Sequence, residues 1–246
     1  MGKLRADQDA YGHEIRDHHR GKAGQEIIER SDGFIDGSAG PSAYFTEYAD
    51  WRACDRRAID MARGRVLDIG CGAGRHALYL QSKGLDVLGV DLSPLAIKTC
   101  KLRGLKKTKI ASITDASPRW GTFDTIIMFG HNFGLFGTFA RARRLLRRFG
   151  RMTSPAGRLI VQSLDPYQTD EPWHKRYHRQ NLRRGRMAGQ ARIRVRYKGW
   201  ISPWFDYLLV SQDEMRKVLD GTGWQVRRFY DSPGPGYAAL IEKAKG

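Results

Sequence analysis

The stretch that decides the fold runs from Val66 to Arg75 and reads Val-Leu-Asp-Ile-Gly-Cys-Gly-Ala-Gly-Arg. Its first part contains the apolar residues Val66, Leu67 and Ile69, which are typical of a central strand in a parallel sheet, where both faces are buried. Glycines at 70, 72 and 74 let the backbone turn tightly and approach a ligand with no side chain in the way. A helix that begins after this turn presents unpaired N–H groups and a positive dipole end. The stretch therefore predicts a strand, a glycine turn and a helix that hold a nucleotide-like cofactor.

Details of the turn indicate which cofactor it holds. A dinucleotide fingerprint, G-x-G-x-x-G, would need a glycine at position 75, where this chain has Arg75. Asp68 lies two residues before the first glycine, and a carboxylate there repels a pyrophosphate and attracts an ammonium group. Asp91 ends the next apolar run, where a carboxylate can accept both hydroxyls of a ribose. We expect a ligand with a ribose and a cationic amino-acid tail but no phosphate.

With these residues, the segment from about Arg65 to Ile160 resembles the class I S-adenosylmethionine-dependent methyltransferases. The Ser93-Pro94 helix start, Asp115 after a third strand and a fourth strand over 123–128 extend the resemblance. It implies S-adenosyl-L-methionine as the cofactor and methyl transfer as the activity. A Rossmann-like domain that binds another nucleotide is the alternative interpretation.

Ligands of open parallel sheets bind at the carboxyl ends of the strands, which places the expected cofactor residues at four strand ends. By the resemblance, Gly70 and Gly72 approach the methionine part, Asp91 binds the ribose and Asp115 binds the adenine amino group. Asp91 and Asp115 could also serve only as helix or turn caps. The residues expected at the cofactor are Asp68, Gly70, Cys71, Gly72, Gly74, Asp91, Leu92, Asp115, Ala116 and Phe129.

The segment after the fourth strand is where the resembled family places residues that face the methyl acceptor. Methyl transfer from a sulfonium is an in-line displacement, which needs a positioned acceptor more than acid–base groups. His131 is the candidate base and Asn132 the candidate orienting residue, although either could be a loop residue that hydrogen-bonds locally. We expect no metal, because His174 and His178 lack a third ligand and fit a polar helix face better.

Two absences narrow the acceptor. The chain has no Asn- or Asp-Pro-Pro-aromatic run, which is typical of enzymes that methylate exocyclic amines of adenine or glutamine. Methylation of cytosine at carbon 5 needs a cysteine nucleophile, and Cys54, Cys71 and Cys100 all precede the fourth strand. Both absences favour a small-molecule acceptor over a nucleic acid.

The order of the expected elements predicts a doubly wound α/β fold with a mostly parallel, seven-stranded sheet of the class I methyltransferase type. Strands are expected at 65–69, 86–91, 108–113, 124–129 and 158–163, with a turn at 154–157 before the fifth, and closing strands at 225–230 and 237–242. In the resembled family the last strand is antiparallel to the others. Residues 1–62 form an arm and helix of the same domain, and 63–246 form the methyltransferase domain.

Two segments lie outside this alternation. The N-terminal arm is expected to be helical and to end in the turn-rich run 36–41; Ser42 then caps a helix to Met61 with aromatic residues at helical spacing. Those aromatic side chains could line the sulfonium site or pack the helix onto the sheet. After strand five, residues 165–210 predict an insertion over the sheet edge with one helix and two strands, which would line the acceptor site or a dimer surface.

The net charge of +17 raises the question of a nucleic-acid partner. The densest basic run, 141–149, keeps Ala142, Leu145, Leu146 and Phe149 on one helical face, which favours a solvated helix packed on the sheet. The basic region 183–196 is harder to explain as a solvated helix packed on the sheet. Three widely spaced cysteines, no apolar leader and no long apolar run predict a cytoplasmic protein without a membrane segment.

The sequence thus predicts an S-adenosylmethionine-dependent methyltransferase that acts on oxygen, nitrogen or carbon of a small molecule, as a monomer or homodimer. One alternative is an RNA methyltransferase, which would bind RNA in a salt-dependent way. The other is a regulatory subunit that binds the cofactor without transferring the methyl group.

Overall fold

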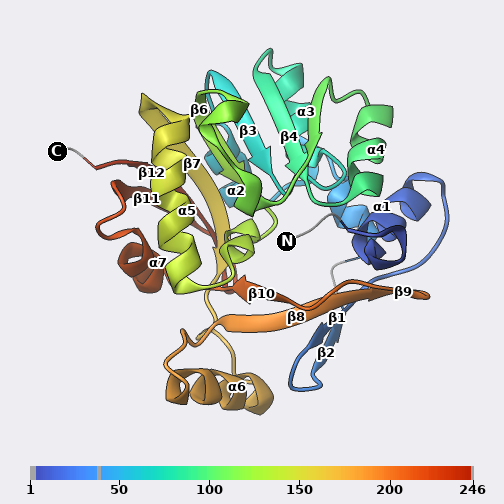
Figure 1. The fold of residues 1–246 in the computed structure, drawn as a ribbon, viewed down its shortest axis with the longest axis vertical. Coiled ribbons are helices and arrows are strands. Elements are labelled where there is room, and N and C mark those ends of the chain that lie inside the picture. The colour runs from blue at the N-terminus through green and yellow to red at the C-terminus, as the bar shows by residue number, and fades with distance from the viewer. Residues whose placement is uncertain (1–3, 38–39, 245–246) are drawn as a thin grey trace. The chain divides into compact units, whose positions relative to one another are not determined.

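The computed structural model describes residues 4–37 and 40–244. Its larger sheet has seven strands in the order β11-β12-β7-β6-β3-β4-β5 (Figure 1). The pairs β4–β5 and β6–β7 are parallel, whereas β12 is antiparallel to both β7 and β11, so the sheet is mixed. The predicted fold class, with an antiparallel last strand, is confirmed. The strands are β3 (Arg65–Ile69), β4 (Asp86–Asp91), β5 (Lys107–Ile110), β6 (Phe123–Met128), β7 (Thr153–Leu164), β11 (Trp224–Asp231) and β12 (Gly236–Lys243).

The described chain divides into two compact units. The first comprises residues up to 51, residues 67–115 and residues 192–205; the second comprises 52–66, 116–191 and the chain from 206 onward. The division into an arm at 1–62 and a methyltransferase domain at 63–246 stays a prediction.

In the first unit, two helices follow β3 and β4 as the sequence predicts. Helix α3 (Arg75–Ser82) starts from Gly74, and α4 (Pro94–Leu102) starts from Ser93. The Ser93 side chain accepts a hydrogen bond from the backbone N–H of Ala96, which satisfies one of the free donors at the helix start. The predicted Ser93 cap is therefore confirmed.

The arm contains more structure than a helix and a loop. Helix α1 (Ala10–His19), preceded by the 3-10 turn η1 (Ala6–Gln8), packs against α4 (Figure 1). A hairpin of β1 (Ile27–Arg30) and β2 (Ile35–Gly37) follows, turning at Gly33 with φ of +88°. An Asp-Gly pair between apolar residues was the available hairpin signal. In the predicted turn-rich run 36–41, Ser38 and Ala39 lie outside the described residues.

The single helix predicted from Ser42 to Met61 is wrong. Two 3-10 turns, η2 (Pro41–Tyr44) and η3 (Tyr48–Asp50), precede the short helix α2 (Ala53–Ile59). The guanidinium of Arg75 donates to the Ala43 carbonyl at 2.7 Å and to the Thr46 hydroxyl at 3.1 Å. It thereby takes a carbonyl that a continuous helix would need for its own hydrogen bonds.

Two strand boundaries differ from the prediction. Strand β5 ends at Ile110 rather than 113, and the 3-10 turn η4 (Ile113–Asp115) follows. The Asp115 carboxylate accepts the backbone N–H of Ser112 at 2.9 Å, and this local bond replaces strand pairing. The predicted turn at 154–157 instead lies within β7, where the register with β6 shifts irregularly.

In the second unit, α5 (Phe139–Met152) packs against β7 and against α7 (Gln212–Leu219). The apolar face expected for the arginine-rich helix is confirmed. Ser211 caps α7 and forms a capping box with Glu214. The short turns η5 (Pro118–Trp120) and η6 (Asn132–Phe136) belong to the same unit. The buried residues of α5 are Ala142, Leu145, Leu146, Phe149 and Met152.

The segment after β7 contains the predicted helix, α6 (Pro172–Arg183), and the predicted strands, β8 (Gln190–Tyr197) and β10 (Phe205–Leu208). The pairing partner of β8 was not predicted. Strand β8 pairs antiparallel with β1, placing Ile27 opposite Arg196, and β9 (Trp200–Ile201) pairs with β8. A second sheet, in the order β10-β8-β1-β2, therefore joins the arm to a segment far along the chain.

Within the described residues, none of the helices combines the length and the apolar character that crossing a membrane would require.

Candidate active site

The glycine loop after β3 has the conformation that its sequence predicts. Gly70, Gly72 and Gly74 have φ values of +74°, +54° and +84°, which only glycine adopts at little cost. The backbone N–H groups of Gly70 and Cys71 both donate to the Val90 carbonyl, at 2.8 and 3.1 Å. These bonds fix the loop against the end of β4.

Asp91 at the end of β4 is held by backbone donors on both sides. Its Oδ2 accepts the N–H of Gly72 and its Oδ1 accepts the N–H of Ser93, each at 2.9 Å. Burial raises the pKa of Asp91 to about 6, although these N–H groups favour the ionised form. Each oxygen keeps a further lone pair, so the carboxylate is oriented by the loop and can still accept two hydroxyls. Leu92 follows it, half-buried, before α4.

Asp68 lies under the same loop and is 2% exposed. Its Oδ2 is buried and has no hydrogen-bond partner in the protein. Burial and the nearby Asp91 raise the pKa of Asp68 to about 7, and Arg75 acts in the opposite direction. A buried carboxylate oxygen without a donor is costly, and an ammonium group supplied by a ligand would satisfy it.

Two residues expected at the cofactor, Asp115 and Ala116, differ in their surroundings. Asp115 is exposed, and one of its oxygens accepts the Ser112 N–H, which leaves the other available. Ala116 is fully buried, and its carbonyl accepts a hydrogen bond from Arg148 at 3.1 Å. The structure thus leaves Asp115 able to bind an amino group and also gives it the cap role that the sequence left open.

The acceptor-side residues follow β6 in the second unit. Phe129 is buried, and His131 has a left-handed φ of +61°. The hydroxyl of Tyr207 donates to the His131 carbonyl at 2.8 Å, so β10 helps to hold this turn. A Cβ at Gly134 would lie 2.2 Å from the Tyr207 ring, which makes a glycine necessary there. His131 and Asn132 are both half-buried.

The sequence did not predict a buried polar network that contacts the start of this turn. Gln162 accepts the Gly130 N–H at 2.6 Å and donates its amide to the carboxylate of Asp55. Arg52 in turn donates to Asp55 at 3.1 Å. Gln162 is 1% exposed and follows the buried apolar run Leu159 to Val161, and an amide directly after such a run was the signal. The network fixes the backbone at the start of the His131 turn.

The arm contacts the cofactor loop, which the sequence did not predict. Ile15 of α1 forms a cluster with Ala73 of the loop and Ala96 of α4, against which Tyr11 and Tyr44 pack. A Cβ at Gly72 would lie 2.6 Å from the Tyr11 hydroxyl, so this phenol is at the surface of the loop. The carboxylate of Asp9 accepts the Ser93 hydroxyl at 2.9 Å and fastens α1 to the start of α4.

The predicted site residues therefore fall into two groups. Asp68, the glycine loop, Asp91, Leu92 and Asp115 lie in the first compact unit together with the arm, and Ala116, Phe129, His131 and Asn132 lie in the second. Among residues 4–37 and 40–244 no three His, Cys, Asp or Glu side chains are grouped as a metal site. The glycine loop and its two buried carboxylates define a cofactor-binding α/β protein.

Comparison with known proteins narrows this class. Residues 66–157 match a family described as a methyltransferase domain. The structure is similar to that of a SAM-dependent methyltransferase from Bacteroides fragilis in complex with S-adenosyl-L-homocysteine. The TM-score is 0.84 at 26% identity, over 99% of this chain and 98% of that chain. Residues 66–157 therefore form a methyltransferase domain, and the fold along the whole chain is similar to that of an S-adenosylmethionine-dependent methyltransferase.

Curated relatives match over shorter segments. A ubiquinone biosynthesis O-methyltransferase of Xanthomonas oryzae pv. oryzae is 27% identical over 113 residues, which cover 44% of this chain and 46% of that protein. A magnesium-protoporphyrin O-methyltransferase of Rhodobacter capsulatus is 35% identical over 74 residues, 28% of this chain and 32% of that protein. The chain thus spans less than half the length of either relative.

Proposed function

We propose that this protein transfers the methyl group of S-adenosyl-L-methionine to a small-molecule acceptor. The observation that carries the proposal is the buried Oδ2 of Asp68, which has no partner in the protein and lies under a glycine loop. An ammonium group is the ligand chemistry that such an oxygen requires. The similarity along the whole chain to an S-adenosyl-L-homocysteine complex supports the same cofactor.

The chain offers a separate group for each part of the cofactor. In this proposal Asp68 holds the ammonium group, Asp91 accepts the ribose hydroxyls and Asp115 accepts the adenine amino group. Gly70 and Gly72 let the backbone approach the amino-acid tail, because no side chain intervenes. The cofactor supplies an electrophilic methyl group on a sulfonium, and the protein supplies binding and orientation.

His131 and Asn132 remain the proposed acceptor residues, together with the insertion at 165–210. Their turn is fixed from two directions, by Tyr207 and by the Gln162 network, which suits a positioning role. The names of the two curated relatives describe O-methyltransferases of small molecules, which supports a hydroxyl as the acceptor group. Small-molecule sites usually orient their ligand with a few polar contacts, and in this proposal His131 and Asn132 supply them.

The proposal is tested with the purified protein and two measurements. Calorimetry should show binding of S-adenosyl-L-homocysteine, and cofactor labelled on its methyl group should transfer label to a component of a metabolite extract. Label appearing in RNA instead would make the protein an RNA methyltransferase. Cofactor binding with no transfer to any fraction would make it a regulatory subunit, and binding of a nicotinamide dinucleotide in preference would contradict the proposal altogether.

A further inference from the structure

The hydroxyl of Tyr11, in α1, lies on the cofactor loop and has no role in the site described above. A Cβ at Gly72 would lie 2.6 Å from this hydroxyl, so the phenol touches the face of the loop that the glycine leaves open. Among residues 4–37 and 40–244, no hydrogen-bond partner of this hydroxyl is found. A donor without a partner, placed on a loop that a ligand approaches, is available to that ligand.

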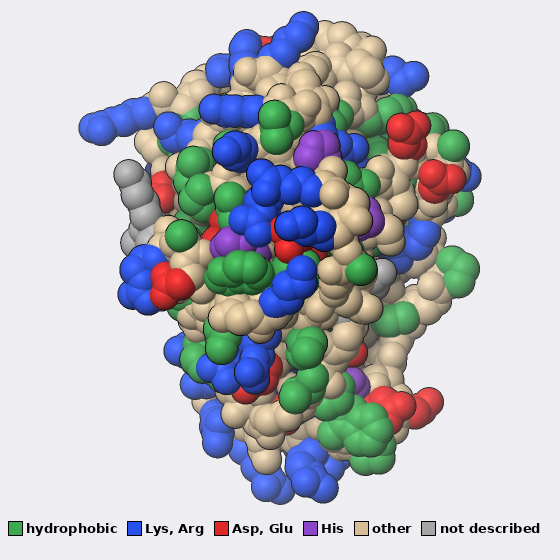
Figure 2. Space-filling model, turned by 90° about the vertical axis from the view of Figure 1, so that its right-hand side faces the viewer, with side chains coloured by type: hydrophobic (Ala, Val, Ile, Leu, Met, Phe, Trp, Pro, Cys, Tyr) green, Lys and Arg blue, Asp and Glu red, His purple; other side chains and the backbone are tan. Residues whose placement is uncertain are grey.

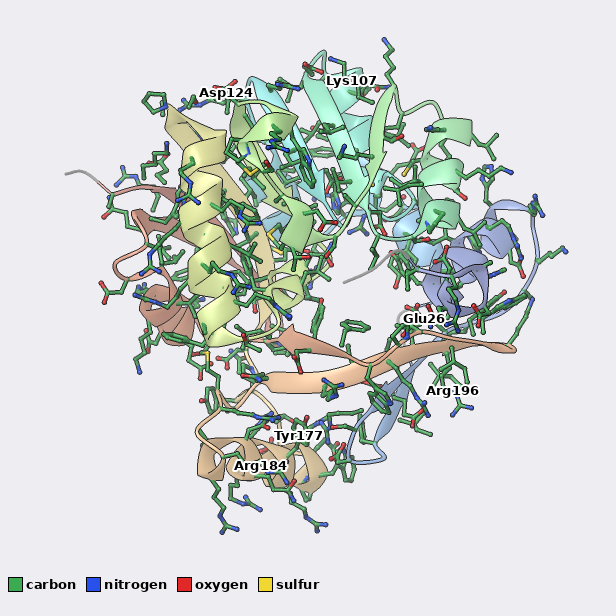
Figure 3. All side chains as sticks on the ribbon, viewed as in Figure 1. Glu26, Lys107, Asp124, Tyr177, Arg184 and Arg196 are labelled. Atoms are coloured by element: carbon green, nitrogen blue, oxygen red, sulfur yellow. The ribbon has the colours of Figure 1, made fainter. Side chains whose placement is uncertain are left out.

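The ring of Tyr11 is held in place by the arm itself. It packs edge-on against the Tyr44 ring with centroids 5.1 Å apart, and the Tyr44 hydroxyl donates to Glu26 at 2.6 Å. Figure 3 shows Glu26 near α1, on the opposite side of β1 and β8 from Arg196. The arm thus positions the Tyr11 ring through contacts that do not use its hydroxyl.

The start of α1 is fastened to the end of β4 through Asp9, which is 2% exposed. Its Oδ2 accepts the Ser93 hydroxyl at 2.9 Å and the backbone N–H of Leu95 at 3.2 Å, so an acid of α1 caps α4. The N–H of Ser93 in turn donates to Asp91 at 2.9 Å. Because Tyr11 follows Asp9 by two residues, the same contacts place it beside the end of β4.

Tyr11 and Asp91 meet at the same residue of the loop. The N–H of Gly72 donates to Oδ2 of Asp91 at 2.9 Å, and the open side of the same glycine faces the Tyr11 hydroxyl. Burial, and after it the nearby acidic groups of Tyr44 and Asp91, raise the pKa of Tyr11 well above its usual value. The phenol therefore keeps its proton at neutral pH and is a donor, whereas the carboxylate near it is an acceptor.

We propose, on the basis of the function proposed above, that Tyr11 is a further cofactor-binding residue and donates its phenol hydrogen to a ribose hydroxyl that Asp91 binds. A ribose hydroxyl has one hydrogen, which Asp91 accepts, and oxygen lone pairs, which accept the hydrogen bond from Tyr11. Each contact polarises the hydroxyl and strengthens the other. The arm is then a wall of the cofactor site, and the site selects a nucleoside with an intact ribose over a deoxy sugar.

The first test is Tyr11→Phe, which keeps the ring against Tyr44 and removes only the hydroxyl. Affinity for S-adenosyl-L-homocysteine, measured by calorimetry, should fall about threefold to tenfold, as expected for one lost hydrogen bond. The Tm of the ligand-free protein should stay unchanged, because none of the described residues bonds to this hydroxyl.

The matched control is Tyr44→Phe, which removes a hydroxyl of the arm that bonds to Glu26 and not to the loop. It should keep the affinity for S-adenosyl-L-homocysteine within about twofold of the wild type. Unchanged affinity in Tyr11→Phe would overturn the proposal. An equal loss in Tyr44→Phe, or a lower Tm in Tyr11→Phe, would also overturn it, because the hydroxyl would then act through the packing of the arm.

The second test identifies the part of the ligand that Tyr11 contacts. Methylthioadenosine keeps the ribose but lacks the amino-acid tail, and a dideoxy analogue of it also lacks both ribose hydroxyls. Tyr11→Phe should weaken methylthioadenosine by the same factor as S-adenosyl-L-homocysteine and should leave binding of the dideoxy analogue unchanged. A loss confined to S-adenosyl-L-homocysteine, or an equal loss with the dideoxy analogue, would overturn the proposal. Failure of the wild type to bind S-adenosyl-L-homocysteine would instead contradict the proposed function, so the two failures are distinguishable.

Discussion

At the scale of single residues, two buried acids, Asp68 and Asp91, have different roles because they have different hydrogen-bond partners. Both oxygens of Asp91 accept backbone N–H groups, so its orientation is set before any ligand arrives. Asp68 keeps one buried oxygen without a partner, so a ligand must satisfy it. Replacing each residue is therefore expected to have a different effect.

For Asp91 the expected effect is a loss of affinity. Asp91→Ala should weaken S-adenosyl-L-homocysteine binding by about 1.5–3 kcal/mol, through lost contacts to the ribose and a loosened loop. Asp91→Asn, which keeps one oxygen, should fall between it and the wild type. Calorimetry measures both, and Asp86→Asn, at the exposed start of the same strand, is the control. Unchanged affinity in Asp91→Ala would remove Asp91 from the cofactor site.

For Asp68 the expected effect depends on pH. Its pKa in the folded protein, about 7, is above the ordinary 3.8, so its contribution to stability is fully present below about pH 4 and is lost as pH rises through about 7. Asp68→Asn should therefore raise the free energy of unfolding of the ligand-free protein at pH 8 by about 1–4 kcal/mol. Urea denaturation at pH 5 and pH 8 measures the change.

The same substitution should lose cofactor affinity, because an amide cannot pair with an ammonium group. In the wild type, affinity for S-adenosyl-L-homocysteine should fall as pH drops below about 7, since Asp68 must ionise to bind. Affinity that does not change between pH 5.5 and pH 8 would contradict the assignment of Asp68 to the ammonium group.

At the scale of elements, the turn after β6 is held by a strand from the insertion. Tyr207 of β10 lies against Gly134 of η6 and donates to the His131 carbonyl. Two further aromatic residues of the insertion pack on the arm or the core: Tyr197 is 2% exposed, and Trp200 stacks on His13 of α1 with centroids 3.8 Å apart. Part of the insertion is thus a support for the arm.

Gly134→Ala tests the turn directly. Its Cβ would lie 2.2 Å from the Tyr207 ring, so the ring or the turn must move. Overpacking of this kind costs about 1–3 kcal/mol of stability, and methyl transfer should fall more than cofactor binding. Gly199→Ala is the matched control because nothing lies within 4 Å of its Cβ. Equal thermal stability of the two variants would show that the turn adapts freely.

At the scale of the whole molecule, the net charge of +17 is distributed and partly structural. Arg141 of α5 donates to the Phe136 carbonyl at 2.6 Å and Arg148 to the Ala116 carbonyl at 3.1 Å. Figure 2 shows Lys and Arg side chains over much of one face, with acidic, hydrophobic and His side chains between them. This distribution differs from a continuous basic tract along a groove.

RNA affinity should therefore be weak and non-specific, with Kd of about 10⁻⁴–10⁻⁶ M at physiological salt. Binding of a folded transfer RNA and of a random single strand should be similar, and both should decrease steeply as salt rises. Filter binding at 50 and 200 mM salt provides the measurement. Tight, selective binding to one RNA at physiological salt would return the RNA methyltransferase interpretation to first place.

The sequence by itself determined the parts of this protein whose signals are local. The glycine loop, the strands that flank it, the Ser93 cap and the apolar face of α5 were all predicted and observed. Each depends on neighbours within a few residues: positive φ needs glycine, a cap needs a hydroxyl, and a buried helix face needs apolar residues at its period.

Only the tertiary structure decided the features that join distant segments. Arg75 takes the Ala43 carbonyl and breaks the expected helix, β8 pairs with β1, and Gln162 reaches Asp55. The hydrogen bond from the Glu26 backbone N–H to the Glu14 carboxylate depends likewise on how α1 and the segment before β1 fold together. Such contacts form between groups more than ten residues apart, and their free energies depend on burial and on partners that no local pattern specifies.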